Sequence, residues 1–325
     1  MRLSSLVALA VGSLSILTGI ATAAAESFPT RPITLIAPFV PGGTVDTLSR
    51  QIAPYLSEIL GTDVIIENRP GASGNIGAAH VAKSRPDGHT LLLTASTIIF
   101  NPLVMKAQQS VDLEKDFRPI GQVARTALAF VVSPSSGIKN VQEFIQYAKT
   151  RPQDANFGVG AFGSGGHLAM EYFNVVAGTQ IPMIIYKGSA ATLTDIAGGQ
   201  VTGMLDPVMT TLPFVQGARL TPIAVTGESR NPLMPEVPTL AEQGIHDMDF
   251  DSWYGIWAPA DVPDEVAAKL QSALTQALNH PKLNTWLLEQ ALSPGTTTGT
   301  AFAKLIKDEY TKYVNVVKKA NFEPK

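Results

Sequence analysis

Residues 32–60, PITLIAPFVPGGTVDTLSRQIAPYLSEIL, constrain the fold more than any other part of the sequence. The stretch opens with an apolar, β-branched run that is typical of a buried strand. From Thr44 onward, the apolar residues recur at the spacing of an amphipathic helix. Gly42 and Gly43 separate the two patterns, and Thr44 is predicted to cap the helix. The sequence therefore predicts a strand that turns directly into a helix.

This glycine turn is a predicted anion site. The first N–H groups of a helix have no partner within the helix, and the helix dipole favours negative charge near them. Glycines let a ligand approach those N–H groups closely. Asp46 falls in the first helical turn, which leaves two interpretations open. Its carboxylate either sits favourably near the helix N-terminus or orients water or a ligand amine.

Residues 1–25 have the pattern of a secretory signal peptide. One basic residue, Arg2, precedes an apolar core, and Ala23-Ala24-Ala25 follows, so we expect cleavage near Ala25. The alternative is an uncleaved membrane anchor, because the apolar segment is fairly long. The sequence contains no cysteine, which excludes disulfides and thiolate metal sites.

The composition indicates an ordinary globular protein. Removing 25 of the 325 residues leaves 300, which suggests two domains or one large α/β domain. The net charge is −3, and no basic cluster stands out, so we expect no nucleic-acid partner. The five histidines show no metal-ligand spacing, so we expect no metal and no cofactor.

Alternating strand and helix patterns predict parallel sheets. Strands at 63–67 and 89–96 follow the first strand, with a small-residue helix between them. Such units place ligands at the carboxyl ends of the strands. A second strand–glycine–helix junction follows strand 155–159, and later strands end at Tyr186 and Asp206. Residues 117–124 and 128–133 are predicted as separate stretches, and 250–258 as a mixed segment whose tryptophans serve packing.

Several catalytic and cofactor motifs are missing. Neither glycine cluster matches a Walker A loop or a dinucleotide fingerprint, which argues against phosphate and nucleotide ligands. Ser164 lies in a glycine-rich turn, but a hydrolase nucleophile elbow needs glycine where this chain has Phe162. His167 is only three residues away at the start of the same helix, an unusual place for a general base. A serine hydrolase is therefore the weakest alternative.

Five segments in order resemble the Bug family, the periplasmic solute-binding proteins of the tripartite tricarboxylate transporter type. They are PTRPITLIAPFVPGGTVD, ENRPGASGNIGAAHVAKSRPDGHTLL, GVGAFGSGGHLAMEYF, YKGSAATLTDIAGGQV and PEVPTLAEQG. The resemblance implies an α/β, type II-like periplasmic-binding-protein fold with two lobes. Each lobe would be a mainly parallel sheet flanked by helices, with the ligand in the cleft between them. We expect residues 26–127 with about 251–299 in lobe 1, and 128–250 with about 300–325 in lobe 2.

The resemblance also implies how a ligand is held. Family members grip a carboxylate between two strand–helix loops, through backbone N–H groups and ordered water. Thr202-Gly203 departs from the family, where Val-Asp is common at this place. Carried onto this sequence, the expected ligand-binding residues are Phe39, Pro41, Gly42, Gly43, Thr44, Asp46, Ser96, Phe162, Gly163, Ser164, Gly165, His167, Tyr186, Lys187, Gly188 and Asp206.

The expected function is capture of a small carboxylate solute in a cleft that closes by a hinge motion, without catalysis. The solute would be a dicarboxylate, an amino acid or an aromatic carboxylate. The protein would work as a monomer in the periplasm and deliver the solute to the subunits of a membrane permease. Two alternatives remain: a ligand sensor for a membrane receptor, and an exported serine hydrolase that uses Ser164.

Overall fold

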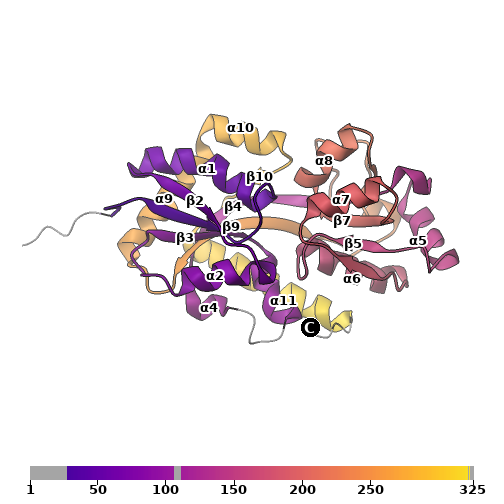
Figure 1. The fold of residues 1–325 in the computed structure, drawn as a ribbon, viewed down its shortest axis with the longest axis horizontal. Coiled ribbons are helices and arrows are strands. Elements are labelled where there is room, and N and C mark those ends of the chain that lie inside the picture. Colours follow the sequence, from indigo (N-terminus) through magenta and orange to yellow (C-terminus); the bar gives the residue numbers. More distant parts are fainter. Residues whose placement is uncertain (1–27, 106–110, 321, 323–325) are drawn as a thin grey trace, which may run out of the picture.

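The computed structural model describes residues 28–105, 111–320 and 322. The predicted signal peptide lies outside these residues. Two α/β lobes lie side by side, and strands β4 and β9 run at their junction (Figure 1). The predicted two-lobed architecture is therefore confirmed.

The first lobe is built on a mostly parallel sheet. Strand β1 (Ile33–Ala37) pairs in parallel with β2 (Val64–Asn68) and β3 (Thr90–Ala95), and β3 pairs antiparallel with β9 (Asp251–Pro259). One face packs against α1 (Thr44–Leu60), α9 (Asp264–Asn279) and α10 (Pro281–Glu289). The other face packs against α2 (Asn75–Ala82) and α3 (Thr97–Val104). The short helix α4 is Leu113–Asp116.

The second lobe repeats this pattern with shorter strands. Strand β5 (Phe157–Val159) pairs in parallel with β6 (Met183–Ile185) and β7 (Gly203–Pro207). The helices of this lobe are α5 (Val141–Thr150), α6 (Gly165–Ala177), α7 (Ser189–Ala197) and α8 (Val208–Gln216). The pattern of the sequence did not indicate α8, which contains Pro213. Smaller elements are η1 (Ala72–Gly74), η3 (Pro134–Ser136), η4 (Ala241–Gln243) and β10 (Ser293–Pro294).

One strand, β4 (Phe117–Val132), belongs to both lobes. Its residues 117–127 pair with β9, and its residues 128–132 pair with β7. Strand β8 (Thr221–Val225) pairs with residues 129–132 as well, so β7 and β8 lie on opposite edges of β4. The prediction of two separate stretches here was wrong, and so was the mixed segment at 250–258, which is strand β9. Both errors have the same cause, because only long-range pairing, of β4 with β9 and β7 and of β9 with β3 and β4, reveals that these strands are continuous.

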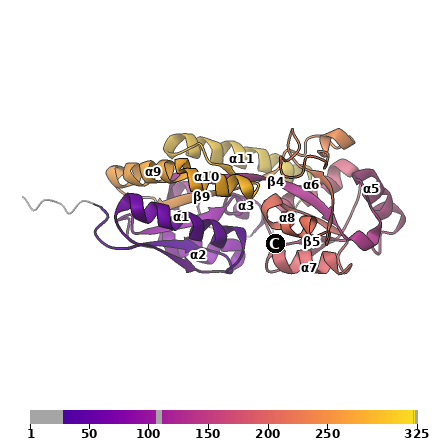
Figure 2. The same ribbon diagram turned by 90° about the horizontal axis from the view of Figure 1, so that it is seen from above.

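Helix α11 (Gly299–Lys319) contacts both lobes. The ring of Tyr313 lies 3.8 Å from that of Phe100 on α3, and Lys319 Nζ donates to Tyr172 Oη on α6 at 3.2 Å. Figure 2 shows α11 running along the molecule from the first lobe to the second. None of the helices in the described part of the chain has the length and apolar character needed to span a membrane.

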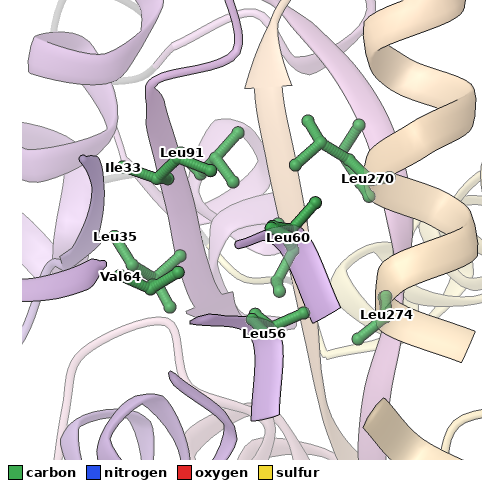
Figure 3. Close-up of a pocket in the computed structure, with 10 residues that line it drawn as sticks. Ile33, Leu35, Leu56, Leu60, Val64, Leu91, Leu270 and Leu274 are labelled. Carbon is green, nitrogen blue, oxygen red and sulfur yellow. The ribbon is translucent and has the colours of Figure 1, made fainter. Parts of the chain in front are cut away.

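The core of the first lobe contains a small void of about 10 Å³. Apolar side chains from β1, β2, β3, α1 and α9 surround it (Figure 3). A water molecule needs about this volume or more, and also polar partners, which this wall of leucine, isoleucine and valine does not supply. The void is therefore a packing feature and not a ligand site.

Four phenylalanines form the centre of the second lobe. The Phe130 ring of β4 lies 4.7 Å from Phe144, 5.8 Å from Phe157 and 5.4 Å from Phe173, measured between ring centroids. All four side chains are fully buried. The shared strand is thus fixed to the second lobe by aromatic packing.

We predict that Phe130→Ala lowers the free energy of unfolding by about 3–5 kcal/mol, because a buried aromatic side chain is lost and a cavity remains. Urea denaturation followed by circular dichroism measures the change. Ile184→Ala, at a side chain that is 41% exposed on β6, is the control and should cost less than about 1 kcal/mol. Equal losses in the two variants would contradict the proposed packing role.

Candidate functional site

The turn between β1 and α1 leaves the first helical N–H groups without a side-chain cap. Gly43 is the N-cap residue, and no side chain accepts a hydrogen bond there. The prediction that Thr44 caps the helix was wrong, because Thr44 is already the first helical residue. Gly42 has a φ of +85°, a left-handed conformation that favours glycine. Pro41 and Gly42 are exposed, so the N-terminus of α1 is open on this side.

The buried carboxylate of Asp46 holds this turn in place through hydrogen bonds. Its Oδ2 accepts from Gly42 N at 2.9 Å and from Arg50 Nε at 3.1 Å, and its Oδ1 accepts from Asn68 Nδ2 at 2.9 Å. The residue is only 4% exposed. Burial alone would raise the pKa of Asp46, but the hydrogen bonds from Arg50, Gly42 and Asn68 together lower it. The carboxylate is therefore ionised and held by protein groups.

Asn68, at the end of β2, connects the same turn to the loop that follows β2. Asn68 Nδ2 also donates to the carbonyl oxygen of Phe39 at 3.1 Å. The ring of Phe39 packs against Gly74, where an added Cβ would lie 3.3 Å from Phe39 Cζ. Phe39 is half-buried and supports the loop that follows β2.

The second glycine turn precedes α6 and is capped. Ser164 is the N-cap, and its Oγ accepts from His167 N at 3.1 Å. Nδ1 of His167 accepts from Gly163 N at 3.0 Å, and its ring lies 4.9 Å from that of Phe162. The imidazole is 2% exposed, and its Nε2 lies 3.6 Å from Glu171 Oε1. Nδ1 is thus engaged by the turn itself and does not face Ser164 as a base.

Gly165 and Gly166 bring α6 close to the strands at the junction. An added Cβ on Gly165 would lie 3.5 Å from the carbonyl oxygen of Asp251 at the start of β9. An added Cβ on Gly166 would collide with the carbonyl oxygen of Leu205 on β7. Gly166 is therefore required for packing, whereas Gly165 has room for a side chain.

The turn between β6 and α7 contributes differently from the two glycine turns. Tyr186 Oη donates to Asp195 Oδ2 at 2.7 Å, and burial together with this bond raises the pKa of Tyr186 to about 12. Gly188 is the N-cap of α7, with a φ of +137°. Lys187 is exposed. The hydroxyl of Tyr186 thus stabilises its own lobe.

Asp206, at the end of β7, is buried beside two helix N-termini. Ser189 Oγ on α7 donates to its Oδ1 at 2.9 Å, and Thr210 Oγ1 on α8 donates to its Oδ2. Burial raises the pKa of Asp206 to about 7, although the two hydroxyl groups oppose the shift.

Tyr254 on β9 connects the two sides of the junction. Burial raises its pKa to about 12, the hydroxyls of Ser252 and Thr44 oppose the shift, and the charge of Asp206 adds to it. Ser252 Oγ donates to Tyr254 Oη at 3.2 Å. Tyr254 therefore lies near Thr44 at the N-terminus of α1 and within electrostatic reach of Asp206 on the other lobe.

A further contact between the lobes lies at Gly163, whose φ is +73°. An added Cβ there would lie 2.9 Å from Val104 Cγ2 and 3.1 Å from Asn101 Oδ1, both on α3 of the first lobe. Ser96, just before α3, donates its N–H to Trp253 O at 2.7 Å. Within the described residues, Ser96 Oγ and Asn101 Oδ1 are buried without a hydrogen-bond partner.

The sequence prediction missed Tyr254 and Ser252, whereas Asn101 ends the segment 95–101 that was expected at the carboxyl ends of the strands. Tyr254 and Ser252 reach the junction through the pairing of β9 with β3 and β4. No local motif marks them. The structure shows that the α6 glycine turn approaches residues of β9 and α3.

A large cavity of about 820 Å³ lies elsewhere, between α3, α4, β4 and α11, and none of the predicted site residues lines it. Val111 and Asp112 in its wall directly follow residues 106–110, which lie outside the described residues. The predicted site and this cavity are thus separate. Among the described residues, no group of three or more His, Asp or Glu side chains is arranged to hold a metal ion.

Two α/β lobes that share the strand β4 define the two-lobed periplasmic-binding-protein fold. Residues 48–322 match the model of the tripartite tricarboxylate transporter family receptor. The chain belongs to this family of Bug and TctC receptors.

Solved structures agree with this assignment. "R. palustris Rpa4515 with adipate" is 34% identical, with a TM-score of 0.88, over 92% of this chain and 100% of that one. "Periplasmic binding protein BugD" is 28% identical, with a TM-score of 0.85, over 92% and 100%. "MatC (Rpa3494) from Rhodopseudomonas palustris with bound malate" is 26% identical, with a TM-score of 0.84, over 89% and 100%. The similar structures therefore include one with adipate, one with malate and one periplasmic binding protein.

We predict that Asp46→Asn lowers the free energy of unfolding at pH 7 by about 1–3 kcal/mol, because hydrogen bonds to a buried charge are weakened. The folded-state pKa is lowered, so the stabilisation is complete above the unfolded pKa of 3.8 and is lost as the pH falls through the folded value. Urea denaturation at several pH values should show the gap between variant and wild type closing below about pH 4. The exposed Asp261→Asn is the control. A gap that stays constant down to pH 3 would rule out the charge as the cause.

Proposed function

We propose that this protein captures a small carboxylate solute between its two lobes, with the N-termini of α1 and α6 gripping the carboxylate. The observation that carries the proposal is the position of Tyr254. It lies near Thr44 on α1, and the charge of Asp206 across the junction contributes to its raised pKa. Gly165 of α6 approaches the same strand, β9, at Asp251, which directly precedes Ser252 and lies three residues before Tyr254. Both glycine turns therefore converge on the start of β9.

Backbone groups and hydroxyls would supply the binding energy. Residues 38–46 and 160–167 contain neither lysine nor arginine, so no salt bridge from these turns can neutralise the solute. Each hydrogen bond to a charged acceptor is worth about 1.5–3 kcal/mol. Several of them, with ordered water filling the remaining positions, would support micromolar binding, about −8 kcal/mol. The adipate and malate in the solved relatives favour a solute of this class.

The remaining predicted residues would surround the carboxylate that the N-termini of α1 and α6 hold. Phe39, Pro41, Gly42, Gly43 and Ser96 would line the first lobe, and Asp46 would hold the α1 turn in place through Gly42. In the second lobe, Phe162, Gly163 and His167 would shape the α6 turn, with Tyr186, Lys187 and Gly188 at the edge.

The protein would perform no chemistry. Ser164 Oγ is the cap of α6, and His167 Nδ1 accepts from Gly163, so the pair lacks the bond of an activated nucleophile. Closure would be a hinge motion about β4 and the return to β9, between lobes formed by residues 26–127 with 251–299 and 128–250 with 300–325. The closed monomer would deliver its solute in the periplasm to a membrane permease of the tripartite tricarboxylate type. A receptor-linked sensor would use the same grip.

We predict that a carboxylate from a panel of succinate, adipate, malate, glutamate and benzoate raises the melting temperature at millimolar concentration, because a ligand that binds only the folded state stabilises it. Thermal shift and isothermal titration calorimetry at pH 6 measure the effect. The matching alcohols and amides, which lack the carboxylate, serve as controls. If none of the acids shifts the protein, the carboxylate assignment is wrong.

We predict that Gly43→Val and Gly165→Val each weaken binding at least about tenfold, because the new side chain covers N–H donors and removes charge-assisted hydrogen bonds. The fold should survive, since added Cβ atoms lie 3.7 Å from Val40 O and 3.5 Å from Asp251 O. Gly198→Val, at an exposed helix end with ordinary φ, is the matched control and should bind as the wild type does. Full affinity in both test variants would place the grip elsewhere.

A further inference from the structure

Asp206 differs from the other buried carboxylate of the site. It is 6% exposed, and its two oxygens accept from the neutral hydroxyls of Ser189 and Thr210. No lysine or arginine in the described part of the chain forms an ion pair with it, whereas Asp46 is paired with Arg50. Ionising a buried carboxylate that lacks a cation is costly. Asp206 therefore has an environment that favours its neutral form, and its pKa is raised to about 7.

The elements around Asp206 add no compensating positive charge. Helix α8 and strand β5 carry no titratable side chain. On α7, Asp195 is bound by Tyr186, and on β4, Arg125 is bound by Asp251. The other titratable residues of the neighbouring elements are His167, Glu171 and Tyr172 on α6, Tyr254 on β9, and Arg118 on β4, which pairs with Asp264.

Asp206 also adjoins the second-lobe half of the proposed grip. Its partner Ser189 packs against Gly160 in the β5–α6 turn, where an added Cβ would lie 2.7 Å from Ser189 Oγ. The preceding residue, Leu205, is the one whose carbonyl oxygen touches Gly166 on α6. A carboxylate held at the α6 N-terminus would therefore bring a second negative charge close to Asp206. Two like charges at short range oppose the ionisation of both.

We propose that Asp206 is protonated when the solute is bound, so that, at a pH where the free protein holds it ionised, the protein takes up one proton together with each carboxylate anion. The inference rests on the proposed function, because it needs a carboxylate at the grip. It also defines the solute class more closely. A neutral carboxylic acid donates a hydrogen bond, so the solute presents an oxygen acceptor to Asp206 and not an ammonium group.

The test is the pH dependence of binding, measured by isothermal titration calorimetry with adipate and with malate. The wild-type Kd should be nearly constant below pH 7 and should rise up to tenfold per pH unit above it, about tenfold to thirtyfold weaker at pH 8.5 than at pH 6. At pH 8.5, titrations in buffers of different ionisation enthalpy should report the uptake of close to one proton. Asp206→Asn should give the same Kd at both pH values and no proton uptake. Asp154→Asn, at an exposed carboxylate of the same lobe, should keep the wild-type profile.

The possible outcomes distinguish a failure of this inference from a failure of the proposed function. Binding that is independent of pH in the wild type overturns the protonation of Asp206 and leaves the carboxylate grip intact. Binding that tightens as the pH rises also overturns it, because Asp206 would then meet a cation. A pH profile that persists in Asp206→Asn assigns the proton to another group and overturns the role of this residue. If no carboxylate binds at pH 6, the proposed function itself fails and this inference fails with it.

Discussion

The pairing of β4 with both sheets is the constraint on which the rest of the structure depends. Residues 117–127 complete the first sheet with β9, and residues 128–132 complete the second with β7 and β8. Backbone hydrogen bonds fix this register, and a slip by one residue would turn every side chain to the opposite face. Phe130 anchors the second half of the strand in its aromatic core. One strand therefore fixes the position of the two sheets, and of the helices that follow β1 and β5, relative to each other.

The electrostatics of the junction follow from the two buried carboxylates. Asp46 is ionised, because Arg50, Asn68 and the Gly42 N–H hold it, and it fixes the shape of the α1 turn. Asp206 has only hydroxyl partners, and burial dominates its pKa. The first is a structural charge, and the second is the group whose charge can change when an anion arrives. Neither glycine turn carries a cation of its own, so the helix N-termini are the main source of positive potential.

The sequence predicted most of the strands and helices, because their apolar periods and glycine boundaries are local signals. It predicted both glycine turns for the same reason. The N-cap of α1 was misplaced by one residue, since Gly43 and Thr44 are both acceptable caps and only the backbone angles decide between them. Continuity of β4, the strand character of β9 and the role of Tyr254 could not be predicted, because each depends on pairing between residues that are far apart in the sequence. The resemblance to the Bug family supplied the two-lobed arrangement, which the periodicity alone left open.

Helix α11 is a third connection between the two lobes, in addition to β4 and the segment that leads from the second lobe into β9. Its middle is attached to the first lobe by the packing of the Tyr313 ring against that of Phe100, and its end reaches the second lobe through Lys319 and Tyr172. A body joined by two neighbouring strands can both bend and twist, but a brace along one side removes most of the twisting freedom. Opening would then have to release Lys319 from Tyr172, and the ring of Phe322 from those of Phe162 and His167, at the second-lobe end. The C-terminal end of α11 thus opposes separation of the lobes through its side-chain contacts on one side of the molecule.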